Sequence, residues 1–460
     1  MSFASGAYLL FLPAVTGLYW LCPGKYRYVL LLLCSYAFYM GWSAPLAFLL
    51  LGETALCWGA CLLVEKRKSR ALFTLLLCLI FSPLFLCKYA AFFASESQVL
   101  FGWPGSGMLA ALGRVVLPVG ISFYTFQAAS CVIDVYRGQQ KAERNFLRFA
   151  LFVSFFPQLV AGPIEQAGDL LPQLTTPRTF DREDFRAGGR LLLCGFLRKI
   201  CLADFLAPFV DGIFALERPD GSTVLVGAAL FGFQIYNDFA GYSEIALGSA
   251  RLLGIRLTRN FREPYLSRGI RDFWRRWHIT LNRWFRLYVY QPLGGKQRRT
   301  LAVTAVFLLS GLWHGADWTF LLWGAIHALL YGLETVAAKR MKKNLPAALS
   351  ISLTFFAVTL SWLLFRAANI QQAGQMVRAL IAPWHSAQGW QQSGLTTAAL
   401  LHLAVLLPVS FLTGRWAFQE KQTSSNRDLT VAVLLLLLIA FCWLMNLRDG
   451  TPNAFIYFQF

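Results

Sequence analysis

The sequence has little charge, and most of that charge is of one sign. Only 14% of the 460 residues are Asp, Glu, Lys or Arg, whereas 57% are hydrophobic and 15% are aromatic. A water-soluble chain of this composition would expose more apolar surface than it could cover. The composition therefore excludes an ordinary soluble protein and favours an integral membrane protein.

Acidic residues are scarce, with 23 Asp and Glu against 42 Lys and Arg, which gives a net charge of +19. The basic residues gather in short loops between apolar runs, at 66–70, 137–144, 296–299 and 339–343. Loops of this kind face the cytoplasm in membrane proteins. The positive charge thus indicates topology, and we expect no nucleic-acid partner. Following the loops along the chain predicts that both termini are extracytoplasmic.

Metal-binding and redox motifs are also missing. The ten cysteines are scattered through apolar runs without C-x-x-C spacing, and no His-Glu-x-x-His motif occurs. We therefore predict no metal and no permanently bound cofactor.

Long apolar runs predict the fold class. The sequence is interpreted as an all-α, polytopic membrane protein with about 11–13 membrane helices, re-entrant segments included. The first run lacks the basic flank of a signal peptide, so it is expected to be retained. The clearest runs are 5–22, 28–45, 46–63, 71–94, 108–133, 222–250, 347–365, 398–414 and 428–446, and further candidates are 146–162, 187–215, 300–318 and 319–337.

Neither repeats nor a soluble segment are found, so residues 1–460 are predicted to form a single transmembrane domain. We expect four parts: peripheral helices (1–115), a core (116–337) with interfacial helices at 261–296, C-terminal helices (338–446) and an extracytoplasmic tail (447–460).

One histidine stands out because its surroundings are nearly uncharged. From Thr300 to Gly332 the only formal charge is Asp317, and His314 lies inside this run. Imidazole exchanges a proton near neutrality, and an ionisable group at membrane depth is functional by default. If the helix starts at Arg299, His314 lies roughly 22 Å deep, past the midplane. The molecule that accepts the transferred group is therefore expected to reach His314 from the outer side.

A second cluster, at 261–296, alternates arginine and tryptophan around His278. This pattern suits amphipathic helices at the cytoplasmic interface, where tryptophans and arginines also act as simple anchors. An anchor does not need a titratable ring, so His278 is a second candidate for a catalytic residue. We expect the two histidines at different ends of one path, in contact only if 264–290 folds back into the membrane.

Six strings carry a family resemblance, and they occur in order over most of the chain. The strings are Leu117 to Gln127, Phe156 to Ile164, Asp238 to Glu244, Phe273 to Ile279, Tyr290 to Gly295 and Gly311 to Trp318. With them, the chain resembles the membrane-bound O-acyltransferases, in the bacterial branch that acylates exported polysaccharide, such as alginate and peptidoglycan. Ala240 and Glu244 depart from the family's usual Ser and Asp.

The resemblance implies a helical bundle with a central tunnel, in the bacterial cytoplasmic membrane. It implies that His314 is essential and that His278 is the second signature histidine. The expected donor is acetyl-CoA or another acyl thioester, and the expected partner is an extracytoplasmic polysaccharide O-acetyltransferase. A histidine base would help a hydroxyl attack the thioester, and such catalysis typically raises the rate by about 10² to 10⁴-fold. Residues expected to bind donor or substrate, or to line the tunnel, are Arg275, Arg276, Trp277, Asn282, Trp313, Asp317, Asp238, Tyr242 and Gln127.

The sequence ends in an apolar hexapeptide, Phe455 to Phe460. Such a segment is costly to leave in water, so we expect it either in a groove or as an anchor at the outer interface. Its pattern resembles the tail motif of the same branch, which implies that Tyr457 receives the acyl group before passing it outward.

Alternative functions are kept open at this stage. Transfer of D-alanine to teichoic acid is the nearest alternative. A non-catalytic polysaccharide transporter could use Asn237, Asp238 and Glu244 as a coupling site. A scaffold that recruits a separate transferase would not need His314.

Overall fold

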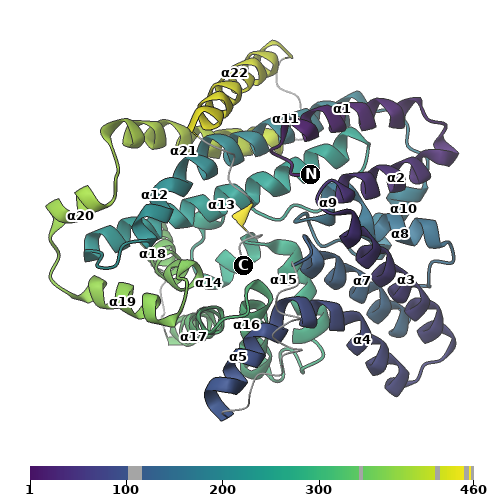
Figure 1. Ribbon diagram of the computed structural model, residues 1–460, viewed down its shortest axis with the longest axis horizontal. Coiled ribbons are helices and arrows are strands. Elements are labelled where there is room, and N and C mark those ends of the chain that lie inside the picture. Colours follow the sequence, from purple (N-terminus) through teal and green to yellow (C-terminus); the bar gives the residue numbers. More distant parts are fainter. Residues whose placement is uncertain (102–116, 341–344, 420–424, 450–454, 457–460) are drawn as a thin grey trace. The chain divides into compact units, whose positions relative to one another are not determined.

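A computed structural model describes residues 1–101, 117–340, 345–419, 425–449 and 455–456, and no strand occurs among them. The chain divides into two compact units, Met1–Gly189 with Ala246–Thr258, and Arg190–Ile245 with Arg259–Phe460. Figure 1 labels the helices of both. The all-α prediction is confirmed.

The first unit is a set of apolar helices in which α3 packs on α7 and α8. Side-chain caps help to fix where the helices begin: the Ser5 hydroxyl accepts the N–H of Tyr8, and Asn145 accepts that of Arg148. The helices are α1 (Gly6–Leu21), α2 (Arg27–Met40), α3 (Ala44–Lys66), α4 (Arg70–Leu84), α5 (Ala90–Phe101), α7 (Ile121–Tyr136), α8 (Phe146–Ser154), α9 (Phe156–Leu159) and α10 (Ala167–Thr175).

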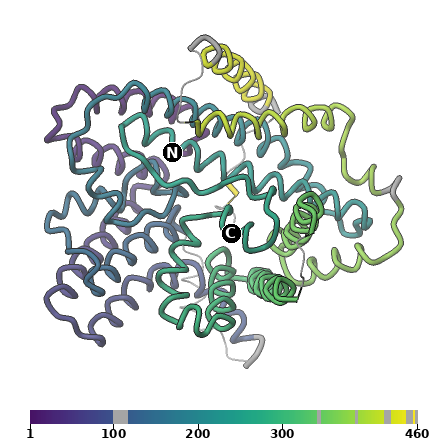
Figure 2. Tube along the Cα trace, turned by 180° about the vertical axis from the view of Figure 1, so that it is seen from behind, coloured from purple at the N-terminus to yellow at the C-terminus, as the bar shows by residue number. Residues whose placement is uncertain are grey.

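The second unit holds the later helices, which Figure 2 follows from teal to yellow. Helices α11 and α13 contribute residues to both units. The bounds are α11 (Arg182–Phe196), the π-helix η3 (Leu197–Ala203), α12 (Asp204–Phe214), α13 (Gly221–Leu252), α14 (Ile270–Arg276), α15 (Ile279–Phe285), α16 (Arg299–His314), α17 (Trp318–Arg340), α18 (Ala347–Arg366), α19 (Ile370–Ile381), α20 (Ser386–Gln392), α21 (Thr397–Ala417) and α22 (Ser425–Asp449).

Among the described residues, six helical stretches are long and apolar enough to cross a membrane: 44–66, 70–98, 318–340, 347–366, 397–417 and 428–445. They coincide with six predicted runs, and they confirm a multi-pass membrane protein. The predicted runs 5–22, 28–45, 222–250 and 300–318 also form helices, namely α1, α2, α13 and α16.

Three predicted runs differ from the helices that the structure contains. Of 108–133, the first part lies outside the described residues, and α7 begins only at Ile121. The run 146–162 breaks into α8 and α9 at Phe155, because Pro157 is accommodated in a first helical turn but not in a helix interior. The run 187–215 stays helical but contains the π-helix η3, a feature frequent at functional sites.

Helices α16 and α17 form a tight hairpin. A Cβ atom at Gly311 would lie 2.3 Å from the carbonyl oxygen of Phe320, and one at Gly324 would lie 2.4 Å from that of Phe307. The two backbones therefore come together where neither helix has a side chain, as small residues allow between membrane helices. Gly311 and Gly324 therefore permit close packing of the two helices.

The segment 261–296 is not simply an interfacial belt. Helix α14 packs against α17 and α18. Trp274, Trp277 and Trp284 are buried, and the Trp277 ring lies 5.0 Å from that of Trp362. Burial of large aromatic surfaces against other rings favours this inward packing.

Candidate functional site

His314 is the last residue of α16 and lies inside an aromatic box. Its ring makes edge contacts with Trp313, Trp323 and Phe365, at centroid distances of 4.9, 5.4 and 5.1 Å. The helix ends because Gly315 is extended, and a Cβ there would overlap the Phe320 ring. The imidazole is 3% exposed. These three rings fix the orientation of the imidazole.

His278 lies between α14 and α15 in the left-handed region, with φ 44° and ψ 55°. Non-glycine residues rarely adopt this conformation, and it persists only where neighbouring groups enforce it. The Asn282 amide donates to the carbonyls of Trp274 and Trp277 at 2.9 and 2.7 Å. On the other side, the Asn260 carbonyl accepts the N–H of Ile279 at 2.9 Å. Asn282 was predicted as a site residue, whereas Asn260 was missed.

The Trp313 indole contacts both histidines. Its ring lies 5.7 Å from that of His278 and 4.9 Å from that of His314. The two imidazole centroids can therefore be no farther apart than the sum of these two distances. The sequence allowed the histidines to come this close only if 264–290 folds back, and α14 does pack on α17 and α18.

Burial also changes the charge expected of His278. It is 1% exposed, and desolvation lowers its pKa to about 3, so the ring is neutral near pH 7. A neutral imidazole cannot add positive charge for phosphate binding. Of its predicted neighbours, Arg275 is exposed, and Arg276 pairs with Asp272 at 2.9 Å.

The tail is docked in the second unit, as far as the structure describes it. Phe455 and Ile456 are 1% and 3% exposed. The N–H of Ile456 donates to Oδ2 of Asp238 at 2.7 Å, and the Phe455 ring stacks on Tyr242 at 4.3 Å. This docking confirms the groove for these two residues, and it brings the predicted Asp238 and Tyr242 together. Tyr457 lies outside the described residues.

Phe239 connects the docked tail with the histidines. Its ring lies 5.8 Å from that of Phe455 and 4.7 Å from that of His278. One continuous series of ring contacts therefore runs from Phe455 through Phe239, His278 and Trp313 to His314.

A buried ionic network on η3 was missed by the sequence analysis. Lys199 Nζ lies 2.8 Å from Asp204 and 2.7 Å from Asp238. Beside it, Arg198 pairs with Glu244 at 3.0 Å and donates to Asn237 at 3.3 Å. The available signal was two adjacent cations inside the apolar run 187–215, since buried charges require partners.

The remaining predicted residues have local structural roles. Gln127 belongs to the first unit, where its amide donates to the Phe152 carbonyl at 2.7 Å. Asp317 accepts the N–H of Thr319 at 2.8 Å and caps the start of α17.

His327 is a packing residue whose two ring nitrogens both have hydrogen-bond partners. Its Nδ1 accepts from the Trp274 indole at 3.2 Å, so its Nε2 carries the proton and donates to the Ser361 hydroxyl at 3.0 Å. That hydroxyl donates in turn to the Val358 carbonyl.

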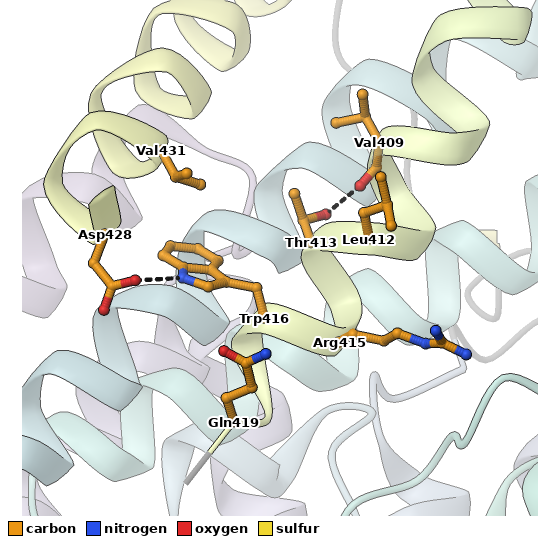
Figure 3. A pocket seen from close by; sticks show the side chains of 8 residues that line it. All are labelled: Val409, Leu412, Thr413, Arg415, Trp416, Gln419, Asp428 and Val431. Atoms are coloured by element: carbon orange, nitrogen blue, oxygen red, sulfur yellow. Dashed lines mark hydrogen bonds between the residues drawn. The ribbon is translucent and has the colours of Figure 1, made fainter. Parts of the chain in front are cut away.

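A cavity of about 440 Å³ lies between α21 and α22 (Figure 3). Trp416 donates to Asp428 across it at 3.0 Å, and Val409, Leu412 and Val431 supply apolar surface. None of the predicted site residues lines this cavity.

Comparison with known proteins identifies the family. The profile of the membrane-bound O-acyltransferase family matches residues 142–372. A probable alginate O-acetylase of Pseudomonas syringae pv. tomato is 38% identical over 93% of this chain and 85% of its own length. A peptidoglycan O-acetyltransferase of Helicobacter pylori is 31% identical over 81% and 75%, and a teichoic acid D-alanyltransferase of Streptococcus thermophilus is 30% identical over 54% and 68%. The chain therefore belongs to the membrane-bound O-acyltransferase family and is an O-acyltransferase.

Proposed function

We propose that this enzyme moves an acetyl group from a cytoplasmic thioester, acetyl-CoA, across the bacterial cytoplasmic membrane for O-acetylation of an exported polysaccharide. In this proposal the acetyl group passes through an O-acetyl ester on Tyr457. Similarity to a probable alginate O-acetylase and a peptidoglycan O-acetyltransferase supports the reaction class. Both termini are proposed to lie on the extracytoplasmic side.

One observation carries the tyrosine relay. Phe455 and Ile456 are buried, the Phe455 ring contacts Phe239, the Phe239 ring contacts His278, and Trp313 contacts both His278 and His314. Tyr457 follows Ile456 directly in the sequence. The proposed acceptor is therefore the next residue after a docked pair that is joined to both histidines by ring contacts.

The proposed chemistry uses His314 as a general base. As the Tyr457 oxygen attacks the thioester carbonyl, His314 takes the phenolic proton. The carbon–sulfur bond breaks, and the coenzyme A thiolate leaves and takes up a proton. Passing the acyl group through tyrosine divides a difficult transfer into two easier ones.

The other predicted residues have supporting roles in this proposal. Neutral His278 contacts Trp313 and so helps to shape the reaction site. Exposed Arg275 is proposed to bind donor phosphate, since guanidinium groups fit phosphate oxygens bidentately. A polysaccharide O-acetyltransferase outside the membrane is proposed to receive the acetyl group from Tyr457.

Mass spectrometry tests the relay most directly. After incubation of the purified enzyme with acetyl-CoA, the C-terminal peptide is expected to gain one acetyl group on Tyr457. Tyr457→Phe should abolish both this modification and polymer acetylation in cells. Tyr26→Phe, at an exposed tyrosine, is the matched control. Full polymer acetylation by Tyr457→Phe would exclude the relay and favour direct attack by a sugar hydroxyl.

D-alanyl transfer is the second candidate, because the teichoic acid enzyme shares sequence over 54% of this chain. The same peptide analysis distinguishes the two, since a D-alanyl ester and an acetyl ester differ in mass. Labelling of Tyr457 from a D-alanyl thioester, and not from acetyl-CoA, would favour this alternative.

A further inference from the structure

We propose that Lys199 is a positioning residue that orients Asp238 to bind the main chain of the C-terminal tail. Lys199, Asp204 and Asp238 are called the tail anchor below. This proposal rests on the proposed function, which gives the reason for docking: a tail that carries the acceptor must be held in one register.

The two oxygens of Asp238 have separate partners. Lys199 Nζ lies 2.7 Å from Oδ1, and the N–H of Ile456 donates to Oδ2 at 2.7 Å. Lys199 Nζ also lies 2.8 Å from Oδ1 of Asp204. One ammonium group therefore links two carboxylates and leaves the second oxygen of Asp238 directed to the tail.

Charge and burial explain why this arrangement holds a peptide. The three side chains of the tail anchor are 3–4% exposed, and together they contain two carboxylates and one ammonium group. A buried carboxylate is stable only when its oxygens receive hydrogen-bond donors. The main-chain N–H of Ile456 is such a donor, so docking of the tail completes the coordination of Asp238.

The tail anchor and the Phe455 site together set the register of the tail. Asp238 binds a backbone group that every residue except proline has, whereas the rings of Tyr242 and Phe239 receive the Phe455 side chain. The two contacts are on consecutive residues, so the tail cannot slide without losing both. A slip of one residue would move Tyr457 along the chain by up to about 3.8 Å, enough to misplace an acceptor hydroxyl.

The first test removes the N–H from the tail and leaves the tail anchor intact. Ile456→Pro has no donor, whereas the matched control Ile456→Val keeps both the N–H and most of the side chain. The readout is the yield of the crosslink that a photo-crosslinking residue at position 455 forms with the Tyr242 region in the full-length enzyme in detergent. We expect this yield to be about tenfold lower for Ile456→Pro than for Ile456→Val, because a hydrogen bond to a charged group is lost. Equal yields for the two variants would overturn the proposal.

The second test changes Lys199, whose Nζ lies 2.7 Å from Oδ1 of Asp238, the oxygen that the Ile456 N–H does not use. Lys199→Met should speed carboxypeptidase release of residues 456 and 455, whereas Asp204→Asn should leave it slow, because Lys199 still reaches Asp238. A photo-crosslinking residue at position 455 should join to the Tyr242 region in Asp204→Asn and lose that product in Lys199→Met. A Lys199→Met protein with an unchanged thermal midpoint, slow release and the same crosslink would contradict the proposal.

These readouts separate the two proposals. Tyr457→Phe should leave residue release and crosslinking unchanged, because Tyr457 is not part of the tail anchor. If Tyr457→Phe still acetylates polymer while Ile456→Pro frees the tail, the relay fails and the tail anchor stands.

Discussion

Two buried polar regions of the second unit follow opposite principles. His314 lies among Trp313, Trp323 and Phe365, whereas Asp238 lies against Lys199 and the tail main chain. Aromatic rings form the walls around this imidazole. The charged region instead provides fixed partners for a polar backbone that has to enter an apolar interior.

Under the proposed function, proton transfer and docking of the tail are assigned to different regions. A general base surrounded by fixed cations would bind protons poorly, and a docking site without charge would leave the tail N–H unsatisfied. Phe239 lies between the regions and contacts both Phe455 and His278. Substitutions on each side should therefore give different phenotypes.

Replacing His314 should have the largest effect on acyl transfer. His314→Gln removes the base and keeps a polar side chain, so we expect about a 10² to 10⁴-fold lower rate of polymer acetylation. His402→Gln is the control, because His402 binds the Cys201 carbonyl and stacks on Phe205. Carboxypeptidase release of the tail should stay slow in both. A His314→Gln enzyme with about half the wild-type rate would show that His314 is not the base.

Removing Lys199 should have the largest effect on stability. Lys199→Met leaves two buried carboxylates without their shared cation, which typically costs about 3–5 kcal/mol of unfolding free energy. The comparison variant is Arg276→Met, which breaks the half-exposed pair with Asp272 and should cost less than about 1 kcal/mol. Denaturation in detergent measures both. Similar losses for the two variants would contradict a special role of the ionic region.

Tight packing of the helix that positions His314 predicts a smaller effect. Gly311→Ala would place a Cβ 2.3 Å from the Phe320 carbonyl and should cost about 1–3 kcal/mol while displacing the end of α16. Gly332→Ala, on the same hairpin, has nothing within 4 Å and should be neutral or stabilising by about 0.5–1 kcal/mol. Thermal midpoints and acetylation rates measured together would show whether His314 depends on this contact.

The sequence predicted the helices well because apolar length is a local property. The run 347–365 became Ala347–Arg366, and the run 398–414 became Thr397–Ala417. His314 was found for the same reason, since a lone titratable group in an apolar run is visible without knowing its neighbours. The box around it could not be predicted, because Phe365 comes from a different helix.

The sequence failed where partners are distant along the chain. Alternating Arg and Trp in 261–296 fits an interfacial helix as well as a packed one, and only contact with Trp362 decides between them. Lys199 gave no sign of its pairing with Asp238 on another helix. The left-handed conformation of His278 also had no local signal, since it is imposed by Asn260 and Asn282.

The acid sensitivity of the enzyme should distinguish a neutral buried His278 from a charged one. Burial lowers the pKa of His278 to about 3, while the unfolded chain has a value near 6.5, so the unfolded state binds the proton more readily between these limits. The stability that this residue contributes is thus complete above about pH 6.5 and decreases as the pH falls toward 3.

The test variant is His278→Asn, because asparagine adopts the left-handed conformation readily and its side chain does not titrate. Between pH 7.5 and pH 5 this variant should lose about 2 kcal/mol less unfolding free energy than the wild type, because the difference is about 1.4 kcal/mol for each pH unit below 6.5. Equal losses for the two proteins would mean that His278 binds the proton as readily in the folded enzyme as in the unfolded chain, and the contrast between an uncharged histidine region and a charged tail anchor would fail.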